Sequence, residues 1–298
     1  MKLQKPENKE KVWSSIKILA ALWMISSLIA VFFSFDSTVM PGNIAVIPLH
    51  GEIMASDDSL GFGGSGTSSD SIVELLIKAE ANDNIKAILL DINSPGGSGV
   101  AADEISQQIK SSDKLCVAVV RDLGASAAYW IASSCDVIFV NRLSLTGSIG
   151  VIGSYLDFSD LIKEYNISYQ RYVSGEYKDM GSPFKKPSPE EEKLFQSLIA
   201  KMRNIFVEEV AINRNMTYSK VDKLADGQIF LGTEAQRNGL ADKIGTKQDA
   251  IKYIETKLNI TAQPTEFRQK KSLTELLYGF SSEKIGKFIN SVPQIQLR

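Results

Sequence analysis

The sequence of 298 residues has little of what most metal sites and histidine-based active sites require. It contains one histidine and two cysteines. Transition-metal sites in proteins draw mainly on clusters of these residues, so no metal site or metal-based catalysis is expected. The formal net charge is −2, so the basic excess typical of nucleic-acid-binding proteins is also missing. The hydrophobic fraction of 44% is ordinary for a chain that folds around a core.

The two cysteines, Cys116 and Cys135, both lie in apolar runs. Their spacing does not match the paired cysteines of zinc sites. We therefore expect two reduced cysteines in the core, and a disulfide between them is the alternative.

One long apolar run lies near the N-terminus. Residues 18–35 carry no charge, and eighteen residues in a helix span roughly 27 Å, close to the thickness of a bilayer's hydrocarbon core. Five lysines and only two glutamates precede this run. The positive-inside rule then predicts a cytoplasmic tail at 1–17, a transmembrane anchor at 18–35, and the remaining chain across the membrane. A cleaved signal peptide is the alternative, but no A-x-A pattern ends the run.

Beyond the anchor, short apolar segments alternate with segments of helical periodicity. This alternation predicts an α/β fold with a parallel sheet covered on both faces. The expected strands are 43–49, 86–92, 115–120, 136–140, 149–152 and 168–173, and the expected helices are 71–81, 100–110, 126–133 and 188–213. The Gly/Ser-rich residues 56–70 are expected to form a loop, and 228–245 combine a strand with a helix.

Two segments could bind or attack a carbonyl group. N-S-P-G-G at 93–97 follows a predicted strand, and its glycines can turn backbone N–H groups toward an oxyanion. A plain tight turn is the alternative. Ser126, in G-A-S-A-A-Y-W, follows the next strand at the start of a helix. It is a candidate nucleophile, with the Ala127 N–H as a second oxyanion donor, or else a helix-capping serine.

A nucleophilic serine needs a base. The single histidine, His50, is one candidate, but a histidine between strand and turn is more often structural. A lysine is the alternative, provided that its surroundings lower its pKa from about 10.4. Lys178, which follows a predicted strand and lies between two glycines, ranks first, whereas Lys185 and Lys186 look solvated. Ser148, in T-G-S-I-G, could present its hydroxyl to the lysine amine or could be a turn serine.

Five motifs in this order resemble the signal peptide peptidase A family of bacterial serine proteases, in its short single-repeat form. They are N-S-P-G-G, G-A-S-A-A-Y-W-I-A, L-T-G-S-I-G-V-I-G, S-G-E-Y-K-D-M-G-S-P-F and G-Q-I-F-L-G-T-E-A-Q-R-N-G-L-A-D-K-I-G. The resemblance covers roughly residues 43–258 and includes the anchor, which gives a peptidase domain at 43–262. The amphipathic tail at 263–298 lies outside it, and a partner-binding or membrane-surface helix is one reading of that tail.

The resemblance implies a Clp protease/crotonase fold, a spiral of βαβ units, and hydrolysis of signal peptides left in the membrane. It implies Ser126 as nucleophile, Lys178 as general base, Ser148 as the hydrogen-bond partner of the lysine, and Gly96 and Ala127 as oxyanion donors. It implies no cofactor, a location in the bacterial inner membrane with the catalytic domain on the periplasmic side, and a homo-oligomeric ring. In short forms a neighbouring subunit can supply the lysine.

One departure from the family pattern concerns the residues after the nucleophile. The family commonly has A-S-G-G-Y, whereas Ala127 and Ala128 stand here, so we expect their methyl groups to affect substrate access. Two other functions remain open. The chain could be an inactive, membrane-tethered scaffold that binds peptides. A crotonase-type acyl-CoA enzyme is disfavoured, because the anchor places the domain where CoA esters are absent.

Overall fold

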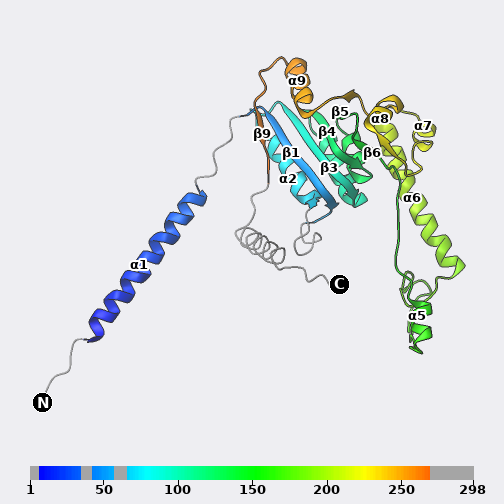
Figure 1. Cartoon of the computed structure of the whole chain (residues 1–298), viewed down its shortest axis with the longest axis horizontal. Coiled ribbons are helices and arrows are strands. Elements are labelled where there is room, and N and C mark those ends of the chain that lie inside the picture. Colours follow the sequence, from blue (N-terminus) through cyan, green and yellow to red (C-terminus); the bar gives the residue numbers. More distant parts are fainter. Residues whose placement is uncertain (1–6, 35–41, 57–65, 269–298) are drawn as a thin grey trace, which may run out of the picture. The chain divides into compact units, whose positions relative to one another are not determined.

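The structure, a computed structural model, describes residues 7–34, 42–56 and 66–268 (Figure 1). The chain divides into two compact units, residues 1–41 and residues 42–298. The first unit contains helix α1 (Glu7–Ser34), which includes most of the predicted anchor. Among the residues described, no helix combines the length and the apolar character needed to cross a membrane. The anchor at 18–35 therefore stays a prediction.

The second unit is a mixed α/β fold built on a largely parallel sheet, as the sequence predicted. The central strands run in the order β2-β1-β3-β4-β5-β8 and are all parallel, while β6 joins β4 in parallel and β7 joins β6 antiparallel. The strands are β1 (Ile44–Met54), β2 (Gly66–Ser68), β3 (Ala87–Gly97), β4 (Leu115–Ala125), β5 (Val137–Val140), β6 (Leu145–Gly147), β7 (Ile229–Leu231), β8 (Lys243–Ile244) and β9 (Pro264–Glu266).

Helices cover both faces of this sheet. The described helices of this unit are α2 (Ser69–Glu80), α3 (Gly99–Lys110), α4 (Ala127–Ser133), α5 (Ser159–Glu164), α6 (Pro189–Asn213), α7 (Tyr218–Asp222), α8 (Gly232–Asn238) and α9 (Lys247–Leu258). Alternate residues of each central strand enter opposite cores, because successive side chains of a strand point to opposite faces. In β3, for example, Leu90 joins the core under α2, α3 and α4, while Leu89 joins the core under α9.

Most predicted elements are confirmed, but strands β3 and β4 run further than their apolar segments. β3 continues through the whole N-S-P-G-G motif to Gly97, and β4 continues to Ala125, directly before Ser126. The predicted loop at 56–70 is wrong at its end, since β2 and the start of α2 occupy 66–70, and residues 57–65 lie outside the described part. Neighbouring strands stabilise these polar extensions through backbone hydrogen bonds, which hydrophobic periodicity does not reveal.

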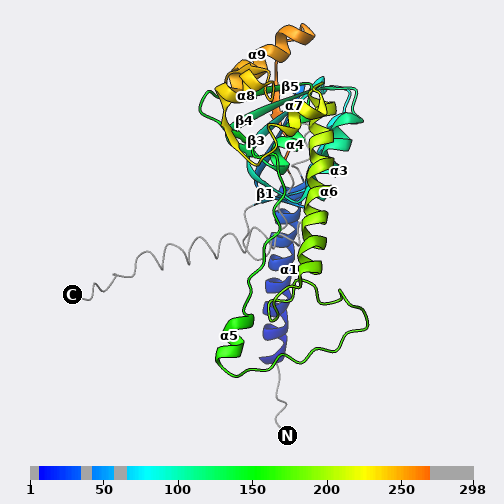
Figure 2. The same ribbon diagram turned by 90° about the vertical axis from the view of Figure 1, so that its right-hand side faces the viewer.

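Two predicted strands are wrong. Residues 149–152 and 168–173 are irregular, and the intervening helix is the short α5. We call residues 151–188, which connect the sheet to α6, the arm. Figures 1 and 2 show the arm and the N-terminal half of α6 extending away from the sheet. The apolar residues of the arm do not pair with a sheet edge, so they do not form strands.

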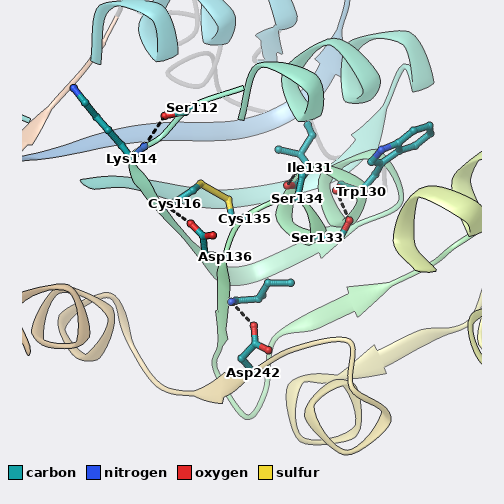
Figure 3. The surroundings of a disulfide bond; sticks show 11 residues. Ser112, Lys114, Cys116, Trp130, Ile131, Ser133, Ser134, Cys135, Asp136 and Asp242 are labelled. Atoms are coloured by element: carbon teal, nitrogen blue, oxygen red, sulfur yellow. Dashed lines mark hydrogen bonds between the residues drawn. A yellow bond between two sulfur atoms is a disulfide. The ribbon is translucent and has the colours of Figure 1, made fainter. Parts of the chain in front are cut away.

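The expectation of reduced cysteines is also corrected. Cys116 in β4 and Cys135 just after α4 form a disulfide, and both are buried, as expected (Figure 3). The Asp136 carboxylate supports the same junction by accepting a hydrogen bond from the Cys116 N–H at 2.8 Å. The start of β4 and the end of α4 are therefore fixed to each other on either side of Ser126.

Candidate active site

The carboxyl ends of β3, β4 and β6 lie side by side at one edge of the sheet. Ser94 of β3 pairs with Gly124 of β4, and Ala125 of β4 pairs with Gly147 of β6. Ligands of open parallel sheets bind at this edge. The structure thus brings together three of the residues singled out in the sequence, Gly96, Ser126 and Ser148, which follow these paired positions.

Ser126 occupies a sharp turn between β4 and α4. Its φ of 55° and ψ of −125° are unfavourable for a residue with a side chain, at a cost of about 1–3 kcal/mol. Its N–H donates to the Gly147 carbonyl at 2.9 Å, and its carbonyl accepts from the Trp130 N–H at 3.0 Å. Ser126 stands at the N-cap position of α4, as the alternative expectation had it, but its side chain makes no capping hydrogen bond. Such strained strand-to-helix turns expose the hydroxyl of a nucleophile.

Gly96 lies directly against this turn. A Cβ atom at Gly96 would be 2.7 Å from the Ala125 carbonyl oxygen and 2.8 Å from the Ser126 Cβ, and its φ is +104°. Only glycine fits both the space and the backbone conformation. The Gly96 N–H, expected to serve as an oxyanion donor, donates a hydrogen bond to the Ser94 hydroxyl at 3.1 Å.

Asn93 links the two motifs, and sequence reasoning did not single it out. The ladder between β3 and β4 shifts register between Ile92 and Ser94. At this irregularity the Asn93 Oδ1 accepts a hydrogen bond from the Leu123 N–H at 3.1 Å. The only signal in the sequence is its position as the first residue of N-S-P-G-G. Its amide replaces a missing backbone acceptor in the segment that leads to Ser126.

Ser148 approaches the site from β6. It has a φ of 49°, and its N–H donates to the Gln228 carbonyl at 2.8 Å. Because the neighbouring Gly147 carbonyl accepts from the Ser126 N–H, the two serines lie on adjacent backbone turns. Both are partly exposed, so their hydroxyls are accessible at the same edge of the sheet.

Lys178 lies apart from these residues in the same chain. It is exposed in a turn of the arm, where its N–H donates to the Gly175 carbonyl at 3.1 Å. Gly181, three residues after Lys178, lies next to Phe195 of α6. On the side of Ser126, Trp130 of α4 stacks on Phe206 of the same helix, with ring centroids 5.0 Å apart. Phe195 and Phe206 are eleven residues apart in one helix, about 16 Å along its axis. A single chain does not bring Lys178 beside Ser126.

Two other lysines of the arm are paired with carboxylates. Lys185, expected to be solvated, is partly buried and lies 2.5 Å from the Glu191 carboxylate, while Lys186 is exposed and lies 2.8 Å from Asp160. The hydrogen bond to Glu191 raises the pKa of Lys185 above its usual value, so this amine holds its proton more firmly. Lys185 is therefore poorly suited to act as a base.

His50 is exposed on β1 and lies opposite Asn93 of β3. Strand β3 separates β1 from β4, the strand that leads to Ser126, so the two strands are about 10 Å apart. This separation does not favour a serine–histidine pair.

Ala127 and Ala128 point into the core. Their exposed fractions are 3% and 0%, and both belong to the cluster beneath α2, α3 and α4. Their methyl groups therefore contribute to core packing and leave the accessible surface of the site nearly unchanged. The expected effect on substrate access does not follow from this structure.

Comparison with known proteins places these motifs in a family. The sequence pattern of peptidase family S49 matches residues 108–261, and that of Clp protease matches residues 61–153. A putative signal peptide peptidase SppA of Enterococcus faecium is 34% identical over 249 residues, which are 83% of this chain and 71% of that protein.

Two further relatives agree. A putative protease of Methanocaldococcus jannaschii is 34% identical over 74% of this chain and 72% of that protein. Protease 4 of Haemophilus influenzae is 34% identical over 74% of this chain, which spans only 35% of that longer protein. The family pattern matches more than half of the chain, and the relatives are 34% identical to it. The chain therefore belongs to peptidase family S49 and is a serine peptidase.

Proposed function

We propose that this chain is a membrane-anchored endopeptidase with a Ser/Lys dyad that degrades cleaved signal peptides and other membrane-derived peptides. The observation that carries the proposal is the strained turn of Ser126 between Gly96 and Ser148. The relative named a putative signal peptide peptidase supports this substrate class. The uncharged run at 18–35 supports the anchor, with the N-terminus in the cytoplasm and the peptidase domain on the outer side.

The reaction follows from these groups. The neutral Lys178 amine takes the Ser126 proton, Oγ bonds to the scissile carbonyl carbon, and the carbonyl π electrons move to oxygen. The Gly96 and Ala127 N–H groups stabilise this oxyanion. The intermediate collapses, the C–N bond breaks, and the leaving amine takes the proton from Lys178. Water then cleaves the acyl-enzyme by the same route, while the Ser148 hydroxyl orients the lysine.

Replacement of the two dyad residues tests this mechanism. Ser126→Ala and Lys178→Ala should each lower kcat for an apolar peptide by at least about a thousandfold, while His50→Ala retains activity. The measurement is peptide hydrolysis by the full chain in detergent. If Ser126→Ala stays active, the proposed mechanism is wrong. If it is inactive but still binds the peptide, Ser126 is needed for catalysis and not for binding, as proposed.

The position of Lys178 bears on how the dyad forms. We extend the proposal to a homo-oligomeric ring in which the arm of one subunit carries Lys178 to Ser126 of the next. The arm supports this arrangement, because it exposes large apolar side chains that an isolated soluble surface rarely presents together. They include Ile152 at 87%, Leu156 at 70% and Tyr172 at 91% exposure. A head-to-tail contact of this kind forms a ring when the rotation between neighbouring subunits closes, and an open filament when it does not.

Subunit mixing tests the ring. Ser126→Ala and Lys178→Ala chains, each inactive alone, should together regain activity after co-assembly, because a Lys178→Ala chain keeps its serine and receives a lysine from its neighbour. Random assembly of equal amounts gives about a quarter of sites with both groups. If mixed assemblies stay inactive although they co-purify, the lysine does not act between subunits.

A further inference from the structure

The N-S-P-G-G motif contains one hydroxyl, that of Ser94, and Ser94 is fully buried. It is 0% exposed, and its Oγ accepts the Gly96 N–H at 3.1 Å. Gly96 is buried as well and lies against Ser126. One of the two backbone donors that the proposed mechanism assigns to the oxyanion is therefore already hydrogen-bonded to a side chain two residues before it.

An oxyanion donor contributes most when it is free and aimed at the position where negative charge develops. Here the Gly96 N–H must leave the Ser94 hydroxyl, or share its proton between two acceptors, before it can serve an oxyanion fully. In the free enzyme, on the other hand, the Ser94 hydroxyl satisfies a buried N–H that would otherwise lose its partner. The same hydrogen bond thus stabilises the fold and competes with the substrate.

We propose that Ser94 is a positioning residue whose hydroxyl occupies the Gly96 N–H in the free enzyme and is displaced from it by the substrate oxyanion. This inference deepens the proposed function and rests on it. It makes an unusual prediction for the Ser94→Ala chain: the fold becomes less stable, while binding of an oxyanion becomes tighter. A residue with a purely structural role would weaken both.

A peptide aldehyde and the matching peptide alcohol provide the test. Ser126 Oγ adds to the aldehyde carbon, the carbonyl π electrons move to oxygen, and the serine proton passes to Lys178, so the adduct carries an oxyanion. The alcohol binds the same surface without forming the adduct. We expect Ser94→Ala to bind the aldehyde about fivefold more tightly, the factor that corresponds to about 1 kcal/mol for one hydrogen bond. Its affinity for the alcohol should not change.

Ser133→Ala is the matched control. Ser133 is equally buried, but its hydroxyl donates to the Trp130 carbonyl at 2.6 Å and accepts from Asn213 at 3.0 Å. Both alanine variants should lower Tm by about 2–4 °C, and only Ser94→Ala should gain aldehyde affinity. Ser94→Cys, whose sulfur is a weaker acceptor, provides a second variant with the same expected direction if the alanine chain folds poorly.

The outcomes separate the two proposals. If the wild-type chain does not prefer the aldehyde over the alcohol, or if that preference survives Ser126→Ala, the proposed function fails and this inference fails with it. If the wild-type preference depends on Ser126 but Ser94→Ala and Ser94→Cys bind the aldehyde equally or more weakly, the role of Ser94 is refuted and the proposed function stands.

Discussion

Arg171 and Asp179 form a two-pronged ion pair within the arm. Arg171 Nε lies 2.5 Å from Asp179 Oδ2, and Arg171 Nη2 lies 2.8 Å from Oδ1. Lys185 approaches the same carboxylate at 3.4 Å and joins it to Glu191 at the start of α6. Because Asp179 follows Lys178 directly, this network fixes the turn that carries the proposed base.

The network predicts an acid-sensitive arm. The hydrogen bond from Arg171, followed by that from Lys185, holds the pKa of Asp179 below its ordinary value of 3.8. The pair therefore contributes stability at pH values above 3.8, and this contribution is lost as the pH falls through the lowered pKa of the folded state. The protection of arm amides against hydrogen exchange, measured relative to the intrinsic exchange rate at each pH, should fall in that range below pH 3.8. Asp179→Asn should show faster arm exchange already at neutral pH.

Asp160→Asn is the control for this prediction, since Asp160 pairs with Lys186 at the exposed surface of the same arm. Its exchange should resemble that of the wild-type chain, because exposed ion pairs contribute little. Equal exchange in the Asp179 and Asp160 variants would contradict a fixing role for the Arg171 pair.

Gly96 should not tolerate a side chain. Gly96→Ala should reduce kcat by about a hundredfold or more, because the new Cβ would displace the Ala125–Ser126 turn and with it an oxyanion donor. Gly99→Ala, three residues away at the start of α3, meets no atom within 4 Å and should keep full activity. Peptide hydrolysis by the two variants measures the difference. Similar activity in both would show that the close approach at Gly96 has no catalytic consequence.

Asn93 should act through the acceptor oxygen that bonds Leu123. Asn93→Ala removes this acceptor and should lower kcat by about fivefold with little change in KM, since the turn ahead of Ser126 loses a hydrogen bond worth about 1 kcal/mol. Asn93→Asp keeps an acceptor at that position and should recover most of kcat. An equal loss in both variants would argue against the acceptor as the cause.

The disulfide between Cys116 and Cys135 should stabilise the segment that contains Ser126. It closes a loop with a sequence separation of 19, for which chain entropy gives about 3 kcal/mol. Urea unfolding of the Cys116→Ala/Cys135→Ala chain should show a loss of this size, and reducing agent should have the same effect on the wild-type chain alone. Identical unfolding curves with and without reducing agent would exclude a stabilising bond.

The sequence by itself determined the elements whose stability is local. Apolar runs of strand length and amphipathic helices of period 3.6 identify the central βα units. The start of α6 is similarly local, because Ser188 and Glu191, three residues apart, form a capping box. The sequence also singled out Ser126, Ser148 and Gly96 as candidates, and they lie at the carboxyl ends of β4, β6 and β3.

Tertiary structure decided what depends on partners distant in sequence. The extension of β3 and β4 through polar residues requires a neighbouring backbone, and the Asn93–Leu123 bond requires a register shift between two strands. The apolar residues of the arm resemble strands in sequence, but no sheet edge pairs with them, so Lys178 lies in an exposed turn. Whether a segment becomes a strand depends on an available edge, and that is a property of the assembled fold.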